Sequence, residues 1–483
     1  MQHVVLNNGG ITAPGSSRRH AGAILATIVA SYLMIVVDIS IVITGLPRIQ
    51  SSLGFSAAQL SWVTNAYTLT FGGLLLLGAR AGDILGRKRM FILGLTAFTL
   101  ASVAIGFAPS ATWLLASRAI QGAGAAVLAP STLALLSTNF AEGPERTRAL
   151  SLYAAAAGVG ATLGLVLGGF FADLVSWRAG FFINLPIGLL LIAAARRHIE
   201  ETPRHAGRFD IGGAVVSTWG MTALVYGLVR TADAGWGDHL AQAALVGGLT
   251  LIAVFVVIER SVSQPILPLR LLVSRERTGA YLARVLFLGG AVGFWFFSTQ
   301  FLQGVLHLRP IQAGLAFLPV TLPNFASAMA VPKLARRFGN EVLLTTGLLL
   351  GVVGLAWLGQ AGVESTYWTG VALPMVLIGL GQGLLLAPLT AAGVAGVAQK
   401  DAGAASGLVN VAHQLGGALG LGLLVLVFAN AAPELGHDAA GLARRISAVM
   451  DVAALLVGLA LIAVLFFIVL PRHRQAEKLE VLS

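Results

Sequence analysis

Apolar segments long enough to cross a lipid bilayer recur along nearly the whole of this 483-residue chain. Fourteen such segments lie at about residues 23–46, 59–79, 90–108, 111–136, 148–172, 179–195, 211–230, 239–258, 279–303, 312–331, 342–361, 367–391, 405–429 and 449–470. Only 11% of the residues are charged, whereas soluble domains carry about 25%. The segments are too long and continuous for the alternating strands of a transmembrane barrel. The sequence therefore predicts an all-α polytopic membrane protein with fourteen transmembrane helices.

The basic residues indicate how these helices are oriented. If the N-terminus is cytoplasmic, the loops and tails on that side carry 23 Lys and Arg residues, and the opposite loops carry six. Arg118 and Arg284 lie inside segments. Basic residues are enriched in cytoplasmic loops. We therefore expect a multi-pass protein of the bacterial cytoplasmic membrane with both termini in the cytoplasm, and the net charge of +11 does not indicate nucleic-acid binding.

An internal repeat indicates how the segments are grouped. The sequence Leu-Ala-Pro-Ser-Thr at 128–132 returns as Leu-Ala-Pro-Leu-Thr at 386–390, about 255 residues later. We expect a disordered tail rather than a signal peptide at 1–22, a six-helix bundle at 23–200, two inserted helices at 201–278, a second six-helix bundle at 279–470 and a second cytoplasmic tail at 471–483. Parallel halves of this kind are typical of transporters whose substrate site lies between them.

Seven short motifs occur in order along the chain. They are Asp38–Pro47, Trp62–Tyr67, Asp83–Arg89, Leu114–Gly124, Gly160–Gly169, Trp177-Arg178 with Asn184–Pro186, and Ser406-Gly407 with Asn410, Gln414, Gly416 and Gly417. On these motifs the chain resembles the major facilitator superfamily, specifically its fourteen-span drug:proton antiporter branch. The resemblance implies the major facilitator fold, with two six-helix bundles and two additional central helices. It also implies alternating access and the export of hydrophobic or cationic small molecules, as in multidrug efflux and antibiotic resistance.

One carboxylate, Asp38, lies deep within a predicted span, where a charge costs about 2.5–3.5 kcal/mol and is normally functional or paired. At 1.5 Å per residue, Asp38 and Arg118 lie about 12 and 10 Å from the same membrane surface, so the two side chains are at a depth that permits pairing. We expect Asp38 to exchange a proton with a cationic substrate while Arg118 tunes it. The alternative interpretation is a static bridge between two helices.

The loop before the third span and the fifth span are expected to serve conformational change. The resemblance implies that Asp83, with Gly86, Arg87 and Lys88, latches one conformation by engaging a helix N-terminus or a basic partner; the basic residues also signal topology. In the fifth span, Gly160, Gly164, Gly168 and Gly169 offer a close-packing face that we expect to let the two halves slide. The related antiporter motif has Pro where this chain has Leu165, so a uniporter remains open.

Other polar and aromatic residues are candidates for the substrate path. His413 is the one histidine of nine inside a predicted span, and either couples protons or packs at a helix interface. Amides and aromatic rings that face the path would orient substrate or bind cations through their π faces, although amides also join helices. The predicted cavity residues are Tyr32, Trp62, Asn65, Tyr67, Gln121, Trp295, Gln300, Gln303, Asn410 and Gln414.

Several classes of function are not supported. The chain has no cysteine, no phosphate-binding loop and no globular segment for an ATPase, so we expect no metal, no cofactor, no ATPase subunit and no enzymatic activity. The proton gradient is the expected energy source, and the expected partners are a small-molecule substrate, protons and the lipid bilayer, with the chain acting as a monomer. The alternatives are a dedicated exporter or uniporter of one endogenous compound (secondary metabolite, lipid or peptide) and, more remotely, a membrane enzyme or sensor.

Overall fold

The computed structural model describes residues 21–140, 143–204, 209–262, 265, 267–398, 401–432, 434, 436 and 438–471. The two expected tails therefore lie almost wholly outside the described residues, as do seven of the basic residues used for orientation. Those seven are Arg18, Arg19, Arg208, Lys400, Arg472, Arg474 and Lys478. Within the described part of the chain, fourteen helices are long and apolar enough to cross a membrane, which confirms the predicted number.

Each predicted span becomes one helix or one pair of consecutive helices. The N-terminal bundle consists of α1 (Ala21–Leu53), α2 (Trp62–Leu85), α3 (Arg87–Gly106), α4 (Ala111–Asn139), α5 (Pro144–Leu174), and α6 (Ala179–Phe182) with α7 (Asn184–His198). The inserted pair is α8 (Ile211–Ala234) and α9 (His239–Ser261). The C-terminal bundle consists of α10 (Arg275–Gln300) with the π-helical η4 (Phe301–Val305), α11 (Pro310–Leu315) with α12 (Leu318–Phe338), α13 (Asn340–Leu358), η5 (Tyr367–Ala372) with α14 (Leu373–Gly393), α15 (Ala402–Asn430), and α16 (Ala439–Val464) with η7 (Leu465–Val469).

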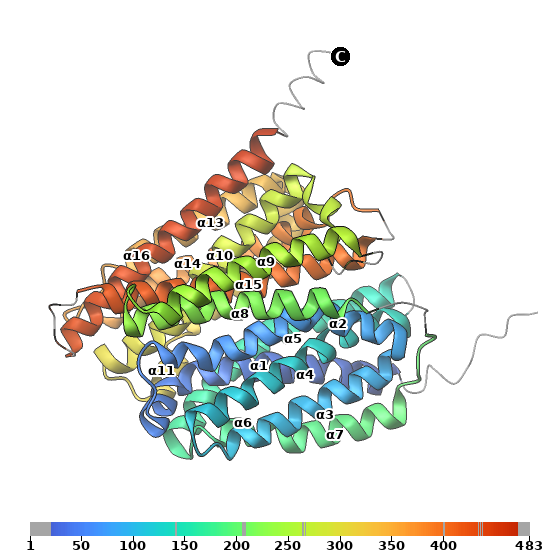
Figure 1. Cartoon of the computed structure of the whole chain (residues 1–483), viewed down its shortest axis with the longest axis horizontal. Coiled ribbons are helices and arrows are strands. Elements are labelled where there is room, and N and C mark those ends of the chain that lie inside the picture. Colours follow the sequence, from blue (N-terminus) through green and yellow to red (C-terminus); the bar gives the residue numbers. More distant parts are fainter. Residues whose placement is uncertain are drawn as a thin grey trace, which may run out of the picture.

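The two bundles lie side by side, with the inserted pair beside their junction (Figure 1). α8 packs against α2 of one bundle and α15 of the other, and α9 packs on α8. We call the end of the molecule where α2 ends and α3 begins the Asp83 face. The opposite end, where η4 ends and α11 begins, is the His307 face.

Glycines allow the helices within each bundle to approach closely. A Cβ atom at Gly78 of α2 would lie 2.2 Å from the carbonyl oxygen of Ala126 on α4, and one at Gly94 of α3 would lie 2.8 Å from that of Gly124. Small residues at such crossings are the usual means by which membrane helices pack, because lipid provides no hydrophobic drive for association.

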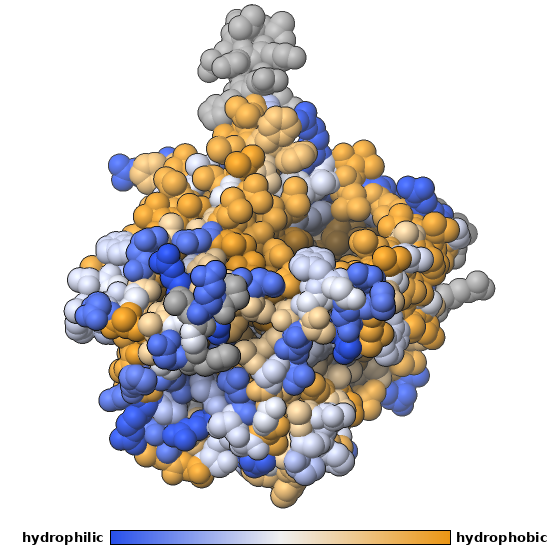
Figure 2. Space-filling model, turned by 60° about the vertical axis from the view of Figure 1, so that its left-hand side comes forward, coloured by the Kyte–Doolittle hydropathy of each residue, from blue (hydrophilic) through white to orange (hydrophobic). Residues whose placement is uncertain are grey.

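The outer surface has the character of a protein embedded in lipid. Large apolar side chains are exposed on many helices, among them Leu100 on α3, Trp219 on α8 and Leu249 on α9. Figure 2 shows hydrophobic residues over the flank of the molecule and hydrophilic residues gathered over the end turned toward the viewer. A continuous apolar flank between polar ends fits a bilayer environment.

Candidate functional site

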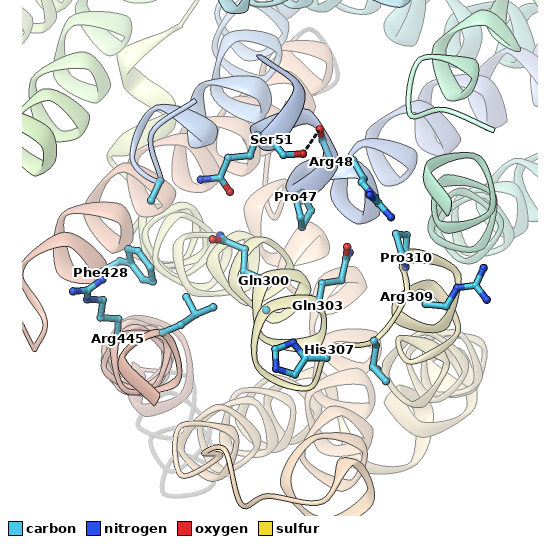
Figure 3. Close-up of a pocket in the computed structure, with 15 residues that line it drawn as sticks. Pro47, Arg48, Ser51, Gln300, Gln303, His307, Arg309, Pro310, Phe428 and Arg445 are labelled. Carbon is cyan, nitrogen blue, oxygen red and sulfur yellow. Dashed lines mark hydrogen bonds between the residues drawn. The ribbon is translucent and has the colours of Figure 1, made fainter. Parts of the chain in front are cut away.

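A cavity of about 560 Å³ lies between the bundles at the His307 face (Figure 3). Its walls come from the end of α1 and the following loop, the end of α10 with η4 and the segment that follows, α15 and α16. The described residues that line it are Pro47, Arg48, Gln50, Ser51, Ala57, Gln300, Gln303, Gly304, His307, Leu308, Arg309, Pro310, Phe428, Leu442 and Arg445. Four of these are Arg or His and none is Asp or Glu, so the fixed charges on the wall are positive.

Two of the predicted cavity residues, Gln300 and Gln303, line this space and point from the C-terminal bundle toward α1 (Figure 3). Gln303 Nε2 donates a hydrogen bond to the backbone oxygen of Thr44 at 3.0 Å and so joins the two bundles. Gln300 Nε2 is buried and has no hydrogen-bond partner among the described residues. A buried donor without a partner costs about 1–3 kcal/mol, which a ligand that accepts the bond would recover.

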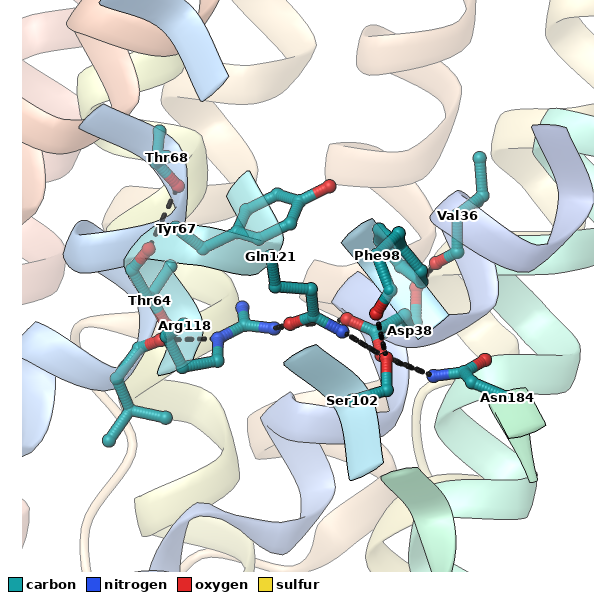
Figure 4. Close-up of polar contacts among 12 residues, drawn as sticks. Val36, Asp38, Thr64, Tyr67, Thr68, Phe98, Ser102, Arg118, Gln121 and Asn184 are labelled. Atoms are coloured by element: carbon teal, nitrogen blue, oxygen red, sulfur yellow. Dashed lines mark hydrogen bonds and ion pairs between the residues drawn. The ribbon is translucent and has the colours of Figure 1, made fainter. Parts of the chain in front are cut away.

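Asp38 and Arg118 meet inside the N-terminal bundle, as their depths in the sequence predict (Figure 4). Asp38 Oδ2 accepts a hydrogen bond from Arg118 Nη1 at 3.0 Å. Asp38 Oδ1 accepts from Gln121 Nε2 at 2.8 Å and from Asn184 Nδ2 at 2.7 Å. The carboxylate on α1 is therefore held by side chains of α4 and α7.

Arg118 is also held by neighbours other than Asp38. Its Nε donates to the backbone oxygen of Val63 on α2 at 3.0 Å, and its Nη1 donates to Gln121 Oε1 at 2.6 Å. The guanidinium carbon lies 4.5 Å from the ring centroid of Tyr67, within the range of a cation–π contact. Tyr67 thus covers Arg118 in this conformation.

The Asp38–Arg118 pair is enclosed by protein. Both residues are 1% exposed, and neither lines any of the described cavities. A cationic substrate would have to displace Arg118 to reach Asp38, so this conformation does not support direct binding of a cation by Asp38. The arrangement provides a buried polar network that joins five helices, α1, α2, α3, α4 and α7. The charge of this network changes when the carboxylate takes up a proton.

The predicted gating loop forms a compact turn at the Asp83 face. Asp83 Oδ1 accepts from Arg87 Nη2 at 3.0 Å, so Asp83 has the expected basic partner. Gly86, between α2 and α3, has φ of +104°, a backbone conformation that glycine adopts readily and other residues rarely do. Arg87 Nη1 also donates to the backbone oxygen of Ala134 on α4 at 3.3 Å.

A different acid, Glu201, engages the helix N-terminus next to this turn. Its carboxylate accepts hydrogen bonds from the backbone N–H groups of Lys88, at 3.0 Å, and Arg89, at 3.1 Å, in the first turn of α3. Lys88 Nζ donates to the backbone oxygen of Arg196. The helix N-terminus that Asp83 was a candidate to engage is therefore bound by Glu201. The described hydrogen bonds of the turn run to α4, to α7 and to the linker after α7, and none of them reaches the C-terminal bundle.

The glycines of α5 pack mainly within one bundle, which corrects the expectation that they let the halves slide. A Cβ atom at Gly160, Gly164 or Gly168 would lie 2.8, 2.5 or 2.4 Å from the nearest atom of α1. Of the four predicted glycines, Gly169 faces the other bundle, where a Cβ would lie 2.4 Å from the backbone oxygen of Pro310; Gly158 of α5 also does so, with a Cβ 2.7 Å from Phe325 of α12. A spacing of four places the first three on one helix face, and the next residue turns by about 100° away from it.

The four aromatic residues predicted to face the substrate path, Tyr32, Trp62, Tyr67 and Trp295, make no described ring contact with one another. Among the described contacts, Tyr32 stacks on Tyr153 with centroids 4.0 Å apart, and Trp62 lies 6.3 Å from Tyr226 of α8. Tyr67 covers Arg118. Trp295 lies 5.2 Å from Phe317 in the C-terminal bundle.

The remaining candidates are divided between helix packing and exposed positions. Asn65 is fully buried, and neither polar atom of its side chain has a hydrogen-bond partner among the described residues. Asn410 is exposed and donates to the backbone oxygen of Ser406 in its own helix. Gln414 lies against Gly72 of α2 and so contacts the other bundle. His413, on α15, is half-buried.

Three residues of these networks were not among the predicted site residues. Asn184 bonds Asp38, Ser102 Oγ accepts from both Gln121 at 2.8 Å and Asn184 at 3.2 Å, and Glu201 binds the start of α3. A polar Asn in an apolar span is a signal that marks Asn184. Ser102 is one of many hydroxyls in these spans, and nothing in its local sequence distinguishes it.

Comparison with known proteins gives a consistent result. The sequence profile of the Major Facilitator Superfamily matches residues 28–421. The chain is 41% identical to the cephamycin export protein CmcT of Amycolatopsis lactamdurans over 425 residues, which cover 86% of this chain and 87% of that protein. It is 39% identical to the puromycin resistance protein pur8 of Streptomyces alboniger, covering 83% and 80%. It is 30% identical to the tetracenomycin C resistance and export protein of Streptomyces glaucescens, covering 86% and 77%.

Solved structures show the same fold at low sequence identity. A bacterial homolog of the human lysosomal transporter Spinster, in an inward-facing conformation, superposes with a TM-score of 0.66 at 15% identity, covering 94% of this chain and 98% of that one. A peptide transporter POT in complex with sulfate gives a TM-score of 0.67 at 15% identity, covering 92% and 94%.

Proposed function

The chain belongs to the Major Facilitator Superfamily, and on that premise we propose that it is a secondary active exporter of small organic molecules that exchanges them for protons by alternating access. Export is supported by the relatives, whose names describe export of or resistance to antibiotics. We further propose that it works as a monomer, without an ATPase subunit, in the bacterial cytoplasmic membrane.

The observation that carries proton exchange is the enclosed Asp38 network. In this conformation the carboxylate receives three side-chain hydrogen bonds and faces one guanidinium. Taking up a proton removes the charge that holds Arg118 and turns one oxygen from an acceptor into a donor. Because these partners belong to α4 and α7, protonation changes the contacts among helices of one bundle. Asp38 thus acts as the proton carrier, and Arg118 as the group that responds to it.

The orientation follows from the described basic residues. The Asp83 face carries Arg87, Lys88, Arg89, Arg336 and Arg337 at its helix ends, among others. We place this face in the cytoplasm, in agreement with the positive-inside rule. The His307 face and its cavity then lie on the outer side of the membrane, where a substrate leaves.

A second candidate is a dedicated exporter of one compound. It is favoured by the names of the relatives above, which each refer to a single antibiotic. Transport of several unrelated compounds by one preparation separates multidrug export from this alternative.

The test is transport by purified protein in proteoliposomes, with and without an imposed pH gradient, using ethidium, puromycin and dansylglycine as probes. We expect Asp38→Asn to abolish gradient-driven transport and to retain gradient-independent counterflow, because asparagine has nearly the shape of aspartate and keeps one acceptor oxygen but carries no proton that it can exchange. The matched control, Asp451→Asn, changes an exposed Asp on α16 and should transport normally. Intact gradient-driven transport in Asp38→Asn would refute the coupling role.

A further inference from the structure

The two bundles meet along two lines, and the inserted pair covers one of them. At the covered line, α2 of the N-terminal bundle packs against α15 of the C-terminal bundle, and α8 packs on both. At the second line, α5 crosses α12, where a Cβ atom at Gly158 of α5 would lie 2.7 Å from Phe325 of α12. Within the described part of the chain, no helix of another span packs against both α5 and α12. The second line of contact is therefore uncovered.

Exposed apolar side chains follow both helices beside this crossing. They are Leu152, Val159 and Leu163 on α5, and Leu322 and Met329 on α12, and each is between 44% and 68% exposed. Spacings of four and seven residues keep each set on one helix face. Because α5 and α12 run in opposite directions and each residue turns by about 100°, the two faces point to the same side of the crossing, away from the neighbours α1 and α14. We call these two adjoining faces the α5–α12 surface, and its apolar character fits contact with lipid.

A basic residue continues each of the two apolar rows toward the Asp83 face. Arg148 lies four residues before Leu152 on α5, and Lys333 lies four residues after Met329 on α12. Counted from the crossing of the two helices, Arg148 is ten residues away and Lys333 eight, which correspond to about 15 and 12 Å along the helix axes. Both residues are exposed. The α5–α12 surface therefore ends in two cationic groups at nearly one level, one from each bundle.

Two further basic residues, Arg336 and Arg337, lie in the last turn of α12 and are exposed. Arg336 Nε donates to a backbone oxygen of its own helix. No described ion pair involves either of them, Arg148 or Lys333. Two acids, Glu145 and Glu341, lie in the first turns of α5 and α13, so the four basic residues exceed the acids in number. This end of the α5–α12 surface therefore carries a net positive charge among the described residues.

We propose that an anionic phospholipid binds the α5–α12 surface, with its phosphate between Arg148 and Lys333 and its acyl chains along the two apolar rows. Arg forms paired hydrogen bonds with phosphate, and Lys meets phosphate as a point charge. Basic groups between transmembrane helices on the cytoplasmic side are suited to hold anionic headgroups. A phospholipid complements both parts of the surface, because it supplies a negative group and apolar chains in one molecule, whereas a soluble anion complements the basic end alone.

This inference goes beyond the proposed export and needs only the proposed orientation, in which the Asp83 face lies at the inner leaflet. The bound lipid contacts both bundles, because Arg148 belongs to one bundle and Lys333 to the other. In the order of the spans, α2 and α12 are the second of each bundle, and α5 and α15 are the fifth. The lipid thus takes the position at the second line of contact that corresponds to the position of α8 at the first.

Equilibrium binding to the full-length protein in dodecyl maltoside micelles tests the proposal with two acyl-labelled fluorescent lipids of equal chain length, anionic phosphatidylglycerol and zwitterionic phosphatidylcholine. We expect phosphatidylglycerol to bind about tenfold more tightly, and Arg148→Gln together with Lys333→Gln to remove most of that preference. The charge-conserving Lys333→Arg should keep it. The matched control, Arg260→Gln together with Arg275→Gln, removes the same charge from exposed residues of α9 and α10 at the Asp83 face and should also keep it.

Four results overturn the proposal. They are equal binding of the two lipids by the wild type, an equal effect of the two double variants, displacement of labelled phosphatidylglycerol by inorganic phosphate, and loss of lipid binding as the protein dimerises. The third would assign the basic residues to a soluble anion, and the fourth would assign the surface to a second copy of the chain. Lipid binding needs no gradient, so its outcome is independent of the transport assay. Lipid preference without proton-driven transport refutes the proposed function alone, and proton-driven transport without lipid preference refutes the lipid site alone.

Discussion

The side chains around Asp38 form a network in which no single pair can be judged in isolation. Asp38 has three hydrogen-bonding partners, and Arg118 also bonds the backbone of α2 and lies over Tyr67. When one partner of a buried charge pair is removed, the other charge remains buried and unpaired, which costs about 3–5 kcal/mol. Removal of both charges leaves no such penalty.

We therefore predict that Arg118→Gln lowers the free energy of unfolding by about 3–5 kcal/mol and that adding Asp38→Asn recovers part of this loss. Thermal unfolding of the purified variants measures both. Arg284→Gln is the matched control: Arg284 is also buried, but it bonds the oxygens of Leu386 and Thr390 on α14. Asp38→Asn should not rescue it, and rescue there would show that the recovery is unrelated to charge pairing.

At this scale the sequence predicts the Asp38–Arg118 pair but not its complete surroundings. The pair can be predicted by counting residues from the end of each span, because the two helices run in opposite directions and place Asp38 and Arg118 at the same depth. Asn184 and Ser102 belong to two other helices, and their rotation toward Asp38 depends on how the whole bundle packs. We expected Asp38 to bind a cation directly because the depth of a residue in the membrane does not show whether its side chain is enclosed by protein.

At the scale of the elements, α5 contains neighbouring glycines, Gly168 and Gly169, that face different helices. Gly160, Gly164 and Gly168 face α1 within the bundle, whereas Gly169 faces α11 of the other bundle. The periodicity of the sequence identifies a close-packing stripe correctly. It does not identify which neighbour the stripe contacts, because that depends on helices far away in the chain.

We predict that Gly168→Ala destabilises the protein by about 1–3 kcal/mol, because the added methyl group enters the space of Thr44 and Ile41 on α1. Gly247→Ala is the matched control, because a Cβ atom on this α9 glycine has no neighbour within 4 Å. That variant should be neutral or slightly stabilised by its higher helix propensity. Equal losses in thermal stability for the two variants would contradict the packing assignment.

The start of α3 supplies a second prediction for an element. Glu201 accepts two backbone N–H groups there, and a negative charge at a helix N-terminus contributes about 0.3–1 kcal/mol when exposed. Glu201→Gln should therefore lower the stability of the protein by about that amount, whereas Glu200→Gln, at an exposed neighbour without described hydrogen bonds, should not. Chemical denaturation of the detergent-purified variants measures the difference, and no difference would mean that the charge of Glu201 contributes nothing.

For the whole molecule, the contacts across the His307 face decide how firmly the bundles are joined in this conformation. Gln303 bonds Thr44, and Arg309 pairs with Asp173, each across the boundary between bundles. The Arg309 side chain is 62% exposed, although that of Asp173 is only 5% exposed. Ion pairs at the protein surface are worth about 0.2–1 kcal/mol, small enough to be broken in each transport cycle. The bundles are thus joined at this face by a few polar bonds, by the close approach of Gly169 to α11 and by apolar residues of both bundles that share one buried cluster.

We predict that Asp173→Asn raises the fraction of molecules in which the two bundles are separated at the His307 face. The increase is up to about fivefold if the lost ion pair contributes about 1 kcal/mol to the joined conformation. The chain has no cysteine, so spin labels at Thr112→Cys and Glu364→Cys, exposed on opposite bundles, report the distance between them. Asp238→Asn breaks the ion pair with Arg230 inside the α8–α9 pair at the same face and should leave the distances unchanged. Unchanged distances in Asp173→Asn would show that the pair does not join the bundles.

The architecture was predictable to a greater extent than the site. Fourteen spans follow from length and hydropathy, since each segment must satisfy its backbone within itself in lipid. The cavity was not predictable in the same way: Gln300 and Gln303 were among the candidates, but Arg48, His307 and Arg445 are loop-end residues that only the three-dimensional arrangement brings to one space. Charge counting treats such residues as topology signals, whereas the structure shows them lining one cavity.

α8 touches both bundles, and this restricts how the molecule can move. Gly73 of α2 meets Thr218 on one side of α8, and Gly422 of α15 meets Leu228 on the other. When one bundle tilts against the other, α8 has to shear along at least one of these interfaces, with α9 carried alongside. The inserted pair therefore limits the amplitude of the tilt, and helices that bind neither cargo nor proton help to determine how wide each opening becomes.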